Sequence, residues 1–324
     1  MIHIDELLAL DTQTLFERAR ALRERVYNRA VFLRGLVEIS SYCGNDCYYC
    51  GLRKSNATAE RFRLTHDEIM TCCESGYAAG LRTFVLQGGE DAHFDDARML
   101  SIVREIHARW PDCAITLSLG ERSRESYQAL HEAGAERYLL RHETANAVHY
   151  AQLHPPELRF ARRMQCLQEL REIGYQVGCG FLVGSPGQTQ EHLREELAFL
   201  RDFRPEMVGI GPFLPHKDTP FAQEPAGSLE LVLRLLAMIR ILLPGVNLPA
   251  TTALGTLSTA GRTVGLQAGA NVLMPNLSPG RTRAQYRLYD GKRFESLDEL
   301  RKSVAQAGYE VVVGRGDPRV HLPR

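Results

Sequence analysis

Three cysteines lie within eight positions of the chain, in the segment YCGNDCYYCG at residues 42–51, which we call the cysteine loop. Their spacing is Cys43-x₃-Cys47-x₂-Cys50. Thiolates spaced this closely can hold a metal centre. Four ligands are the usual complement, however, and no fourth cysteine follows in this segment. A centre held by three thiolates would keep one coordination position open for a small molecule.

Two other kinds of cysteine site fit this spacing less well. Cys47 and Cys50 form a C-x-x-C of the thioredoxin type, but that interpretation leaves Cys43 without a role. A structural zinc site needs four ligands, usually as two spaced pairs, and the nearest downstream histidine, His66, lies across a charged stretch. A [4Fe–4S] cluster fits better, because three thiolates leave one iron free to bind an amine and a carboxylate.

Short apolar runs alternate with helical patterns along the chain, eight times in succession. Each run is rich in β-branched or other apolar residues and is followed by polar residues or Gly. The intervening segments, such as 124–135 and 162–174, show the 3.6-residue period of helices. The eight predicted strands are residues 33–40, 82–87, 114–120, 137–143, 176–184, 206–213, 246–252 and 270–276.

This alternation predicts an α/β fold with parallel strands and right-handed crossovers. Eight successive units favour a (β/α)₈ barrel of the TIM type, with an open doubly wound sheet as the alternative. A helix at 11–29, capped by Asp11, precedes the strands as an N-terminal helical extension, and 296–308 is predicted to be a C-terminal helix. We expect one domain over residues 1–324, divided into an extension (1–32), the barrel (33–285) and a C-terminal segment (286–324).

Polar residues cluster where the predicted strands end, and active-site residues of such barrels gather at these carboxyl ends. The first strand leads into the cysteine loop, and the second ends in QGGED at 87–91. The fourth ends in Arg141-His142-Glu143 and the seventh in Thr251-Thr252. Packing alone explains these groups poorly, so we expect them to line one mouth of the barrel. A solvated strand exit is the simpler alternative for 141–143.

The composition bounds the partners and the location. The 324 residues are 44% hydrophobic. Lys+Arg and Asp+Glu number 39 each, so the chain lacks the excess of basic residues that would indicate binding to nucleic acid or to an anionic membrane. The start, MIHIDELLAL, has no basic n-region followed by an apolar h-region. The longest apolar stretch, 229–243, is too short and too charged to span a bilayer. We expect a cytoplasmic protein, where clustered cysteines favour metal or redox roles.

The cysteine motif, with Tyr49 directly before its last cysteine, resembles the signature of the radical SAM superfamily. This resemblance implies one [4Fe–4S] cluster, held by Cys43, Cys47 and Cys50, whose open iron is chelated by the amino and carboxylate groups of S-adenosylmethionine (SAM). It also implies reductive cleavage of SAM to methionine and a 5′-deoxyadenosyl radical. Residues 180–189 resemble the segment whose backbone packs on adenine.

Longer stretches resemble one family within this superfamily, the HydE maturases of [FeFe]-hydrogenase. The resemblance implies that the adenosyl radical attacks sulfur, either of a cysteine bound to an iron precursor that carries CO and cyanide or of a thiazolidine-like carboxylate. That reaction lies on the route to the H-cluster of the hydrogenase. The stretches that carry the resemblance are 39–56, 83–91, 115–146, 209–221, 251–257 and 268–279.

The resemblance also implies roles for single residues. An anionic substrate needs cationic and hydroxyl donors inside the barrel. Glu143 is expected at the SAM ribose or ammonium, Arg162 at the methionine carboxylate, and Gly88, Gly89 and Glu90 at the methionine amino group. The substrate contacts implied are Arg141, Thr116, Thr251, Thr252 and Tyr286. The remaining cofactor contacts implied are Tyr49 and Tyr289. Tyr286 and Tyr289, which follow the last predicted strand, are expected to close the mouth of the barrel.

The implied partners are SAM, a small anionic sulfur-bearing or iron–cysteine–CO–cyanide substrate, an electron donor such as a ferredoxin or flavodoxin, and other hydrogenase maturases. A PylB-like or biotin-synthase-like activity is the alternative within the superfamily. A non-catalytic iron–sulfur carrier is the alternative outside it, but a carrier needs no SAM pocket. No cysteine follows Cys179 to hold the second cluster found in some HydE proteins. The other cysteines are interpreted as core residues: Cys72, Cys73, Cys113, Cys166 and Cys179.

Overall fold

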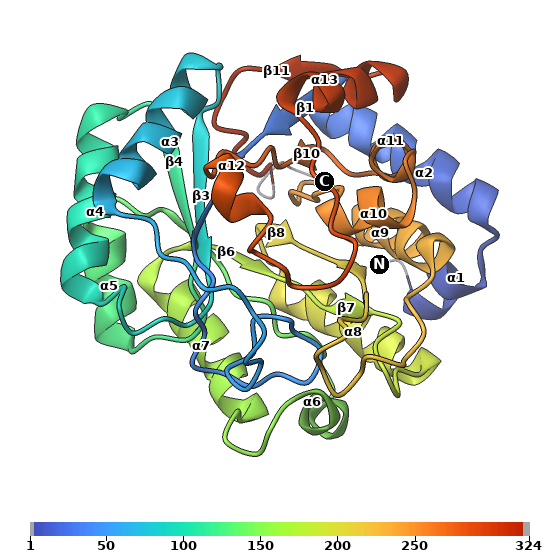
Figure 1. The fold of residues 1–324 in the computed structure, drawn as a ribbon. Coiled ribbons are helices and arrows are strands. Elements are labelled where there is room, and N and C mark those ends of the chain that lie inside the picture. The colour runs from blue at the N-terminus through green and yellow to red at the C-terminus, as the bar shows by residue number, and fades with distance from the viewer. Residues whose placement is uncertain (1–2, 320–324) are drawn as a thin grey trace.

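The fold is known from a computed structural model that describes residues 3–319 (Figure 1). A six-stranded sheet lies at its centre in the order β2-β3-β4-β5-β6-β8, and every neighbouring pair is parallel. The expected α/β fold with parallel strands is therefore confirmed. The strands of this sheet are β2 (Gly35–Ser40), β3 (Thr83–Gly88), β4 (Ala114–Ser118), β5 (Arg137–Leu139), β6 (Gln176–Cys179) and β8 (Met207–Val208).

Two smaller parallel sheets complete the strands of the described residues. In one, β1 (Ala30–Leu33) lies between β10 (Val272–Leu273) and β11 (Glu310–Val312). In the other, β7 (Leu182–Val183) pairs with β9 (Gly211–Pro212). The expectation of one closed barrel is therefore correct only in part, because three sheets replace a continuous ladder. Single parallel bridges link the separate strands: Leu36–Asn276, Met207–Asn247 and Pro249–Val272.

The strand breaks have local causes. The predicted strand 176–184 divides at Gly180, which has φ +154° and faces Gly209 so closely that an added Cβ would lie 2.0 Å from the Gly209 carbonyl oxygen. The backbones can meet there because Gly180 lacks a side chain; a Cβ added at Gly209 would make only ordinary contacts, the nearest at 3.9 Å. The predicted strand 246–252 contains Pro249, which has no N–H for a ladder, and single bridges replace regular pairing. The pattern of apolar runs in the sequence did not predict the strands β1 and β11.

Helices pack around the outside of the sheets (Figure 1). Several begin at a Ser or Thr whose side chain accepts a backbone N–H, and Thr65, Thr189 and Ser296 form full capping boxes. Asp11 caps α2 as predicted. The helices are α1 (Ile4–Ala9), α2 (Thr12–Tyr27), α3 (His66–Ala78), α4 (Asp96–Arg109), α5 (Arg124–Glu132), α6 (Ala147–Leu153), α7 (Phe160–Ile173), α8 (Gln190–Phe203), α9 (Leu229–Leu242), α10 (Thr252–Leu257), α11 (Gly261–Gln267), α12 (Gly280–Arg283) and α13 (Leu297–Gln306).

Two further predictions from the sequence concern membrane-spanning helices and the cysteines outside the loop. In the part of the chain that the structure describes, no helix is both long and apolar enough to cross a membrane. The five cysteines outside the loop are buried, each at most 5% exposed, and all belong to the main hydrophobic core. Their interpretation as core residues is confirmed.

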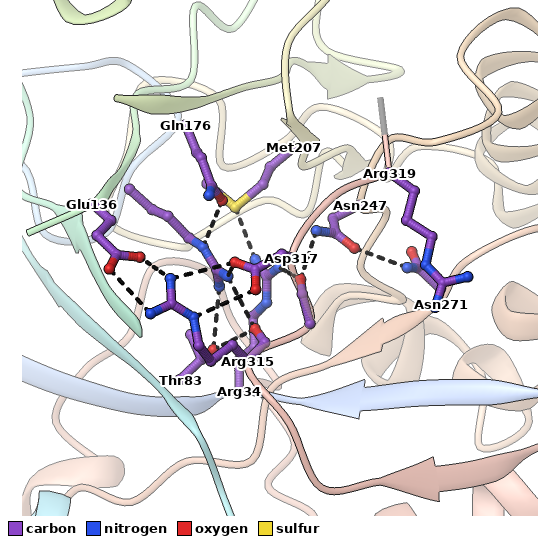
Figure 2. A network of polar contacts seen from close by, with 12 residues as sticks. Arg34, Thr83, Glu136, Gln176, Met207, Asn247, Asn271, Arg315, Asp317 and Arg319 are labelled. Carbon is purple, nitrogen blue, oxygen red and sulfur yellow. Dashed lines mark hydrogen bonds and ion pairs between the residues drawn. The ribbon is translucent and has the colours of Figure 1, made fainter. Parts of the chain in front are cut away.

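The C-terminal segment covers the end of the sheet where the strands begin (Figure 2). The Arg315 carbonyl accepts a hydrogen bond from Thr83 Oγ1 at 2.8 Å. The Gly316 carbonyl accepts from Arg34 Nη2 at 3.1 Å and from Asn247 Nδ2 at 2.9 Å. Because side chains and this segment fill the amino ends of the strands, a ligand site belongs at the opposite ends. The same network includes Arg137, Gln176, Asp317 and Glu136.

Candidate active site

The cysteine loop follows β2 and is closed by its own polar contacts. Asp46 accepts two hydrogen bonds of 2.7 Å from Arg53 and one of 3.1 Å from the backbone N–H of Ser55. The bonds from Arg53 hold the pKa of Asp46 well below its usual range. At its start the loop is bound to the end of β3, because the Gly44 N–H donates to the Glu90 carbonyl at 2.8 Å. These contacts define the conformation of the loop.

Gly89 directly follows β3 and packs against the start of the cysteine loop. A Cβ added at Gly89 would lie 2.2 Å from the Tyr42 carbonyl oxygen and 2.6 Å from Cys43 Cβ. Only a glycine fits at this distance, because the first obstacle is backbone that cannot rotate away. The chain at the end of β3 thus packs directly against the backbone of the cysteine loop.

We predict that Gly89→Ala displaces the cysteine loop. Overpacking of this kind costs about 1–3 kcal/mol, so we expect a lower melting temperature and poorer retention of iron after anaerobic reconstitution. The matched control is Gly280→Ala, since nothing lies within 4 Å of a Cβ added at Gly280. Full iron content and an unchanged melting temperature in Gly89→Ala would show that the loop adapts freely.

The three thiols of the loop are half-buried and free. Burial raises the pKa of each thiol, and mutual repulsion within the group adds to the effect at Cys47 and Cys50, bringing the pKa of Cys50 to about 12. Thiolates gathered this way need a cationic centre to be stable, and coordination deprotonates a thiol. Among residues 3–319, no three His, Cys, Asp or Glu side chains are grouped closely enough to hold a single metal ion.

A cavity of about 330 Å³ opens beside the cysteine loop, at the carboxyl ends of the strands. Cys47 and Cys50 form part of its wall, together with residues from most of the central strands and from the C-terminal segment. A cavity of this size suits a small ligand. The predicted site residues in its wall are Tyr49, Gly88, Arg141, Glu143, Thr251, Thr252, Tyr286 and Tyr289.

Several polar atoms in this wall have no hydrogen-bond partner although they are buried. Arg141 Nη2 lies 3.1 Å from Glu143 Oε2, but the pair does not have hydrogen-bond geometry, and both atoms stay unpartnered along with Arg141 Nε and Thr251 Oγ1. Buried groups without partners are costly. The convergence of these groups of Arg141, Glu143 and Thr251 on one cavity indicates a polar ligand. The predicted site residue Thr116 is not in the cavity wall, although its Oγ1 is also buried and unpartnered; it lies two residues before Ser118, which does line the cavity.

Glu143 is held in a strained backbone conformation. Its φ of +66° is unfavourable for a residue other than glycine. The backbone of Phe181 pairs with it in a parallel bridge, and the Glu143 N–H donates to the Gly180 carbonyl at 3.0 Å. His142, directly before it, is fully buried against Glu196, with Nε2 and Oε2 2.8 Å apart. These contacts fix the turn that directs the Glu143 carboxylate into the cavity wall.

Arg162 lies outside the cavity, and its neighbour Arg163 lines it. Arg162 contacts Glu169 at 3.2 Å and donates to the Arg122 carbonyl at 2.6 Å, with a third of its side chain exposed. Arg163 is buried; its Nε donates to Glu121 at 2.6 Å and its Nη1 to the Arg141 carbonyl at 2.6 Å. Neighbouring helical residues point about 100° apart, so only one of the pair can face inward.

The sequence contained the signal for Arg163. The buried positions of α7 include Arg163, Cys166, Leu167 and Leu170, which form an i, i+3, i+4, i+7 stripe. Arg162 falls outside that stripe. The helical period therefore identifies which of two adjacent arginines faces the core.

Tyr49 is oriented by a histidine on the far side of the cavity wall. Its hydroxyl lies 3.2 Å from His154 Nε2, and His154 Nδ1 lies 2.9 Å from the Tyr150 carbonyl oxygen. The carbonyl can only accept, so Nδ1 carries the proton and Nε2 accepts from Tyr49. Burial lowers the pKa of His154 to about 4, which keeps the ring neutral and able to accept. This contact holds the Tyr49 ring beside Cys50.

Two of the remaining predicted site residues, Glu90 and Tyr286, lie in different places relative to the cavity. Glu90 is not in the cavity wall; its Oε1 accepts from the Glu121 N–H at 2.9 Å and lies 4.0 Å from Arg163 Nη2. Tyr286 is buried in the wall, where its hydroxyl contacts Gln87 Nε2 at 3.3 Å. The wall also holds Gln87, from the segment QGGED, and residues that the sequence did not single out: Glu38, Ser118, Arg163 and Lys292.

Comparisons with known proteins agree with this geometry. The sequence profile of the radical SAM superfamily matches residues 37–200. The [FeFe] hydrogenase maturase subunit HydE of Thermotoga maritima is 46% identical over 280 residues, which cover 86% of this chain and 80% of the relative. The chain belongs to the HydE family of radical SAM enzymes. Both resemblances found in the sequence are therefore confirmed.

Other members of the superfamily are more distant from this HydE-family chain. The 3-methylornithine synthase of Methanosarcina acetivorans is 28% identical over 273 residues, covering 82% of the chain and 76% of the relative. Among solved structures, methylornithine synthase (PylB) matches with a TM-score of 0.85 and 26% identity, covering 95% of this chain and 92% of the other. The fold is thus shared beyond the HydE family.

Membership in the superfamily implies a [4Fe–4S] cluster and SAM, and the residues present fit both. Three thiols stand on one fixed loop, and the loop rests on a glycine where no side chain fits. The adjoining cavity has cationic, anionic and hydroxyl groups without hydrogen-bond partners, which suit the amino and carboxylate groups of SAM.

Proposed function

We propose that this HydE-family chain acts in the maturation of [FeFe]-hydrogenase, the role named for its 46%-identical relative. In this proposal Cys43, Cys47 and Cys50 hold a single [4Fe–4S] cluster, and SAM binds at its open iron. The substrate is a small anionic, sulfur-bearing molecule, either a thiazolidine carboxylate or an iron-bound cysteine with CO and cyanide. An electron donor such as a ferredoxin or flavodoxin and the other maturases are the proposed partners.

One observation carries this proposal beyond family membership. Arg141, Glu143 and Thr251 present unpartnered polar atoms to the same cavity that Cys47 and Cys50 line. A cation and a hydroxyl in a buried cavity favour an anionic ligand, since Thr251 Oγ1 and Arg141 Nε form no hydrogen bond in the described chain and Arg141 Nη2 has only the ion pair with Glu143. A substrate anchored there would lie within one small cavity of the cysteine loop.

When bound, the cluster and SAM supply a 5′-deoxyadenosyl radical, formed together with methionine by one-electron reduction of the sulfonium. Arg141 and Thr251 bind the anionic group of the substrate and so direct its sulfur toward the loop. Tyr49, held by His154, forms the wall next to Cys50. Tyr286 and Tyr289 exclude water from the C-terminal side. Catalysis by these residues is therefore positioning and exclusion of solvent.

The proposal assigns Arg163, in place of Arg162, to the carboxylate of SAM. Arg163 lines the cavity and contacts the Arg141 carbonyl, whereas Arg162 pairs with Glu169 outside it. Glu143 then faces the ribose or the ammonium group. Arg141, which forms an ion pair with Glu143 through Nη2, is assigned to the substrate.

We expect Arg163→Ala to weaken SAM binding by about 1.5–3 kcal/mol, the range for hydrogen bonds to a charged group. Arg163→Lys should recover only part of the loss, because an ammonium lacks the planar fork of a guanidinium. Arg162→Ala is the matched control on the same helix and should bind SAM as the wild type does. Equilibrium binding to the reconstituted protein measures all three. A loss at Arg162 with none at Arg163 would reverse the assignment.

The fold-level part of the proposal concerns how the strands are arranged. We propose that the eight strand–helix units form a (β/α)₈ ring within one domain, with the barrel at 33–285. The three single bridges between the sheets support this, since each joins neighbours that a ring would require. We also propose a cytoplasmic location, which suits eight free cysteines and an oxygen-sensitive cluster.

The deciding experiment is anaerobic reconstitution followed by incubation with SAM, reductant and a thiazolidine dicarboxylate. The expected product is an adenosyl–sulfur adduct. In parallel, the protein should support activation of [FeFe]-hydrogenase in a mixture that lacks its own HydE. Failure of both assays with an intact cluster would favour another radical SAM biosynthetic reaction, such as a PylB-like or biotin-synthase-like one.

A further inference from the structure

A buried ion pair crosses the wall of the cavity and has no role in the chemistry described above. Lys292, in the C-terminal segment, lies with its Nζ 2.5 Å from Oε1 of Glu38, on β2. Glu38 is 1% exposed and the Lys292 side chain 7%. The other carboxylate oxygen of Glu38 accepts from Asn276 Nδ2 at 2.8 Å. Both partners line the cavity.

The ion pair holds a segment that carries two of the predicted site residues. Lys292 Nζ also donates to the Tyr286 carbonyl at 3.0 Å and lies 4.7 Å from the centre of the Tyr286 ring. Leu288 lies between these two residues, and its carbonyl accepts a hydrogen bond of 2.8 Å from the N–H of Gly51, the residue directly after Cys50. The 283–294 segment is thereby attached both to β2 and to the cysteine loop.

The same segment lines two cavities. A second cavity, of about 280 Å³, is lined by residues of 283–294. Tyr289 and Lys292 line both cavities, so the two cavities adjoin at these residues. Arg283 and Arg287 also line the second cavity. Lys292, the partner of Glu38, is therefore part of the boundary of both spaces.

A buried ion pair is a poor way to gain stability. Removing two charges from water costs free energy that their attraction only partly returns, and well-packed neutral replacements are often as stable or more so. Burial raises the pKa of Glu38 and lowers that of Lys292, so each charge depends on the other. An ion pair kept under these conditions, in a cavity wall and between segments far apart in the sequence, points to a functional role.

We propose that Glu38 and Lys292 are positioning residues: their ion pair clasps the 283–294 segment across the cavity and sets the places of Tyr286 and Tyr289. By holding these side chains in the cavity wall, the clasp also shapes the space in which a polar substrate binds. Only the identity of that substrate rests on the proposed function.

The test is a neutral replacement of the whole pair. Glu38→Gln/Lys292→Met removes both charges at similar volume, so we expect a melting temperature close to wild type, normal iron content and normal SAM affinity. The ratio of adenosyl–sulfur adduct to free 5′-deoxyadenosine should nevertheless fall at least tenfold. Lys292→Met alone leaves a buried carboxylate uncompensated and is expected to be less stable. The matched control is Glu136→Gln/Arg315→Met, which neutralises an ion pair at the opposite end of the strands and should leave the ratio unchanged.

The outcomes separate this proposal from the proposed function. A wild-type ratio in the double variant would overturn the clasp and leave the pair with a purely structural role. If the wild type forms no adduct at all, the proposed function fails, and the clasp is judged by two other measurements. Amide hydrogen exchange in 283–294 and 5′-deoxyadenosine formation without substrate should both rise at least tenfold in the double variant, and the absence of either increase overturns the clasp.

Discussion

Replacing Cys43, Cys47 or Cys50 by Ala is expected to abolish SAM cleavage and to reduce bound iron from about four atoms per chain to almost none. In the proposed cluster each thiolate would hold one iron, and two thiolates alone would not retain a cubane. No other cysteine can substitute, because the remaining five are buried in the core. Iron and sulfide analysis after anaerobic reconstitution, and chromatography of 5′-deoxyadenosine, measure the two effects.

The controls for this prediction come from the core cysteines. Cys72→Ala and Cys179→Ala each remove one buried sulfur, which leaves a small void and costs roughly 1–2 kcal/mol of folding free energy. Both should keep four irons and cleave SAM. Eight tightly bound irons in the wild type would contradict a single cluster, and a Cys47→Ala protein that still cleaves SAM would remove that residue from the ligand set.

The sequence identified those parts of the site that depend on short-range order. The spacing of the three cysteines is a local property, so its chemistry could be inferred without a fold. Arg141, Glu143 and Thr251 were found by a general rule, because the carboxyl ends of parallel strands meet at one edge. The structure places all three in the wall of one cavity with Cys47 and Cys50.

The sequence did not identify contacts that depend on distant parts of the chain. Glu38 and Lys292 are 254 positions apart, and no pattern near either residue indicates the other. The breaks at Gly180 and Pro249 follow from backbone approach and from a missing donor, which hydrophobic patterns do not register. Arg163 is a different case: the helical period distinguishes it from Arg162, and the resemblance alone did not.

Removal of the Arg141 guanidinium should separate SAM cleavage from attack on sulfur. We expect Arg141→Gln to lower adduct formation about 100-fold, since misplacement of a reactant by about 1 Å can cost that much. Iron content and SAM affinity should stay close to wild type. The backbone contact to Arg163 uses the Arg141 carbonyl, which the substitution leaves in place. Only the side chain that faces the substrate is changed.

The unpartnered nitrogens of Arg141 make this variant informative. Its Nε and Nη2 form no hydrogen bond with any described residue, so their loss removes no hydrogen bond of the folded chain. Glu143, 3.1 Å from Nη2, does lose a neighbouring cation, and for that reason SAM affinity must be measured beside the adduct. Arg141→Lys should restore part of the activity, as an ammonium keeps the charge without the fork. Arg162→Gln, outside the cavity, is the matched control.

The result for Arg141 also discriminates between radical SAM reactions. If the cavity holds an anionic sulfur-bearing substrate, Arg141→Gln continues to produce 5′-deoxyadenosine while adduct formation and hydrogenase activation fall together. If SAM cleavage and adduct formation fall in proportion, Arg141 belongs to the SAM site and the substrate lies elsewhere. An unchanged ratio with full hydrogenase activation would mean that Thr251 and its neighbours bind the substrate without the guanidinium. The ratio of the two products therefore decides whether Arg141 recognises the substrate or the cofactor.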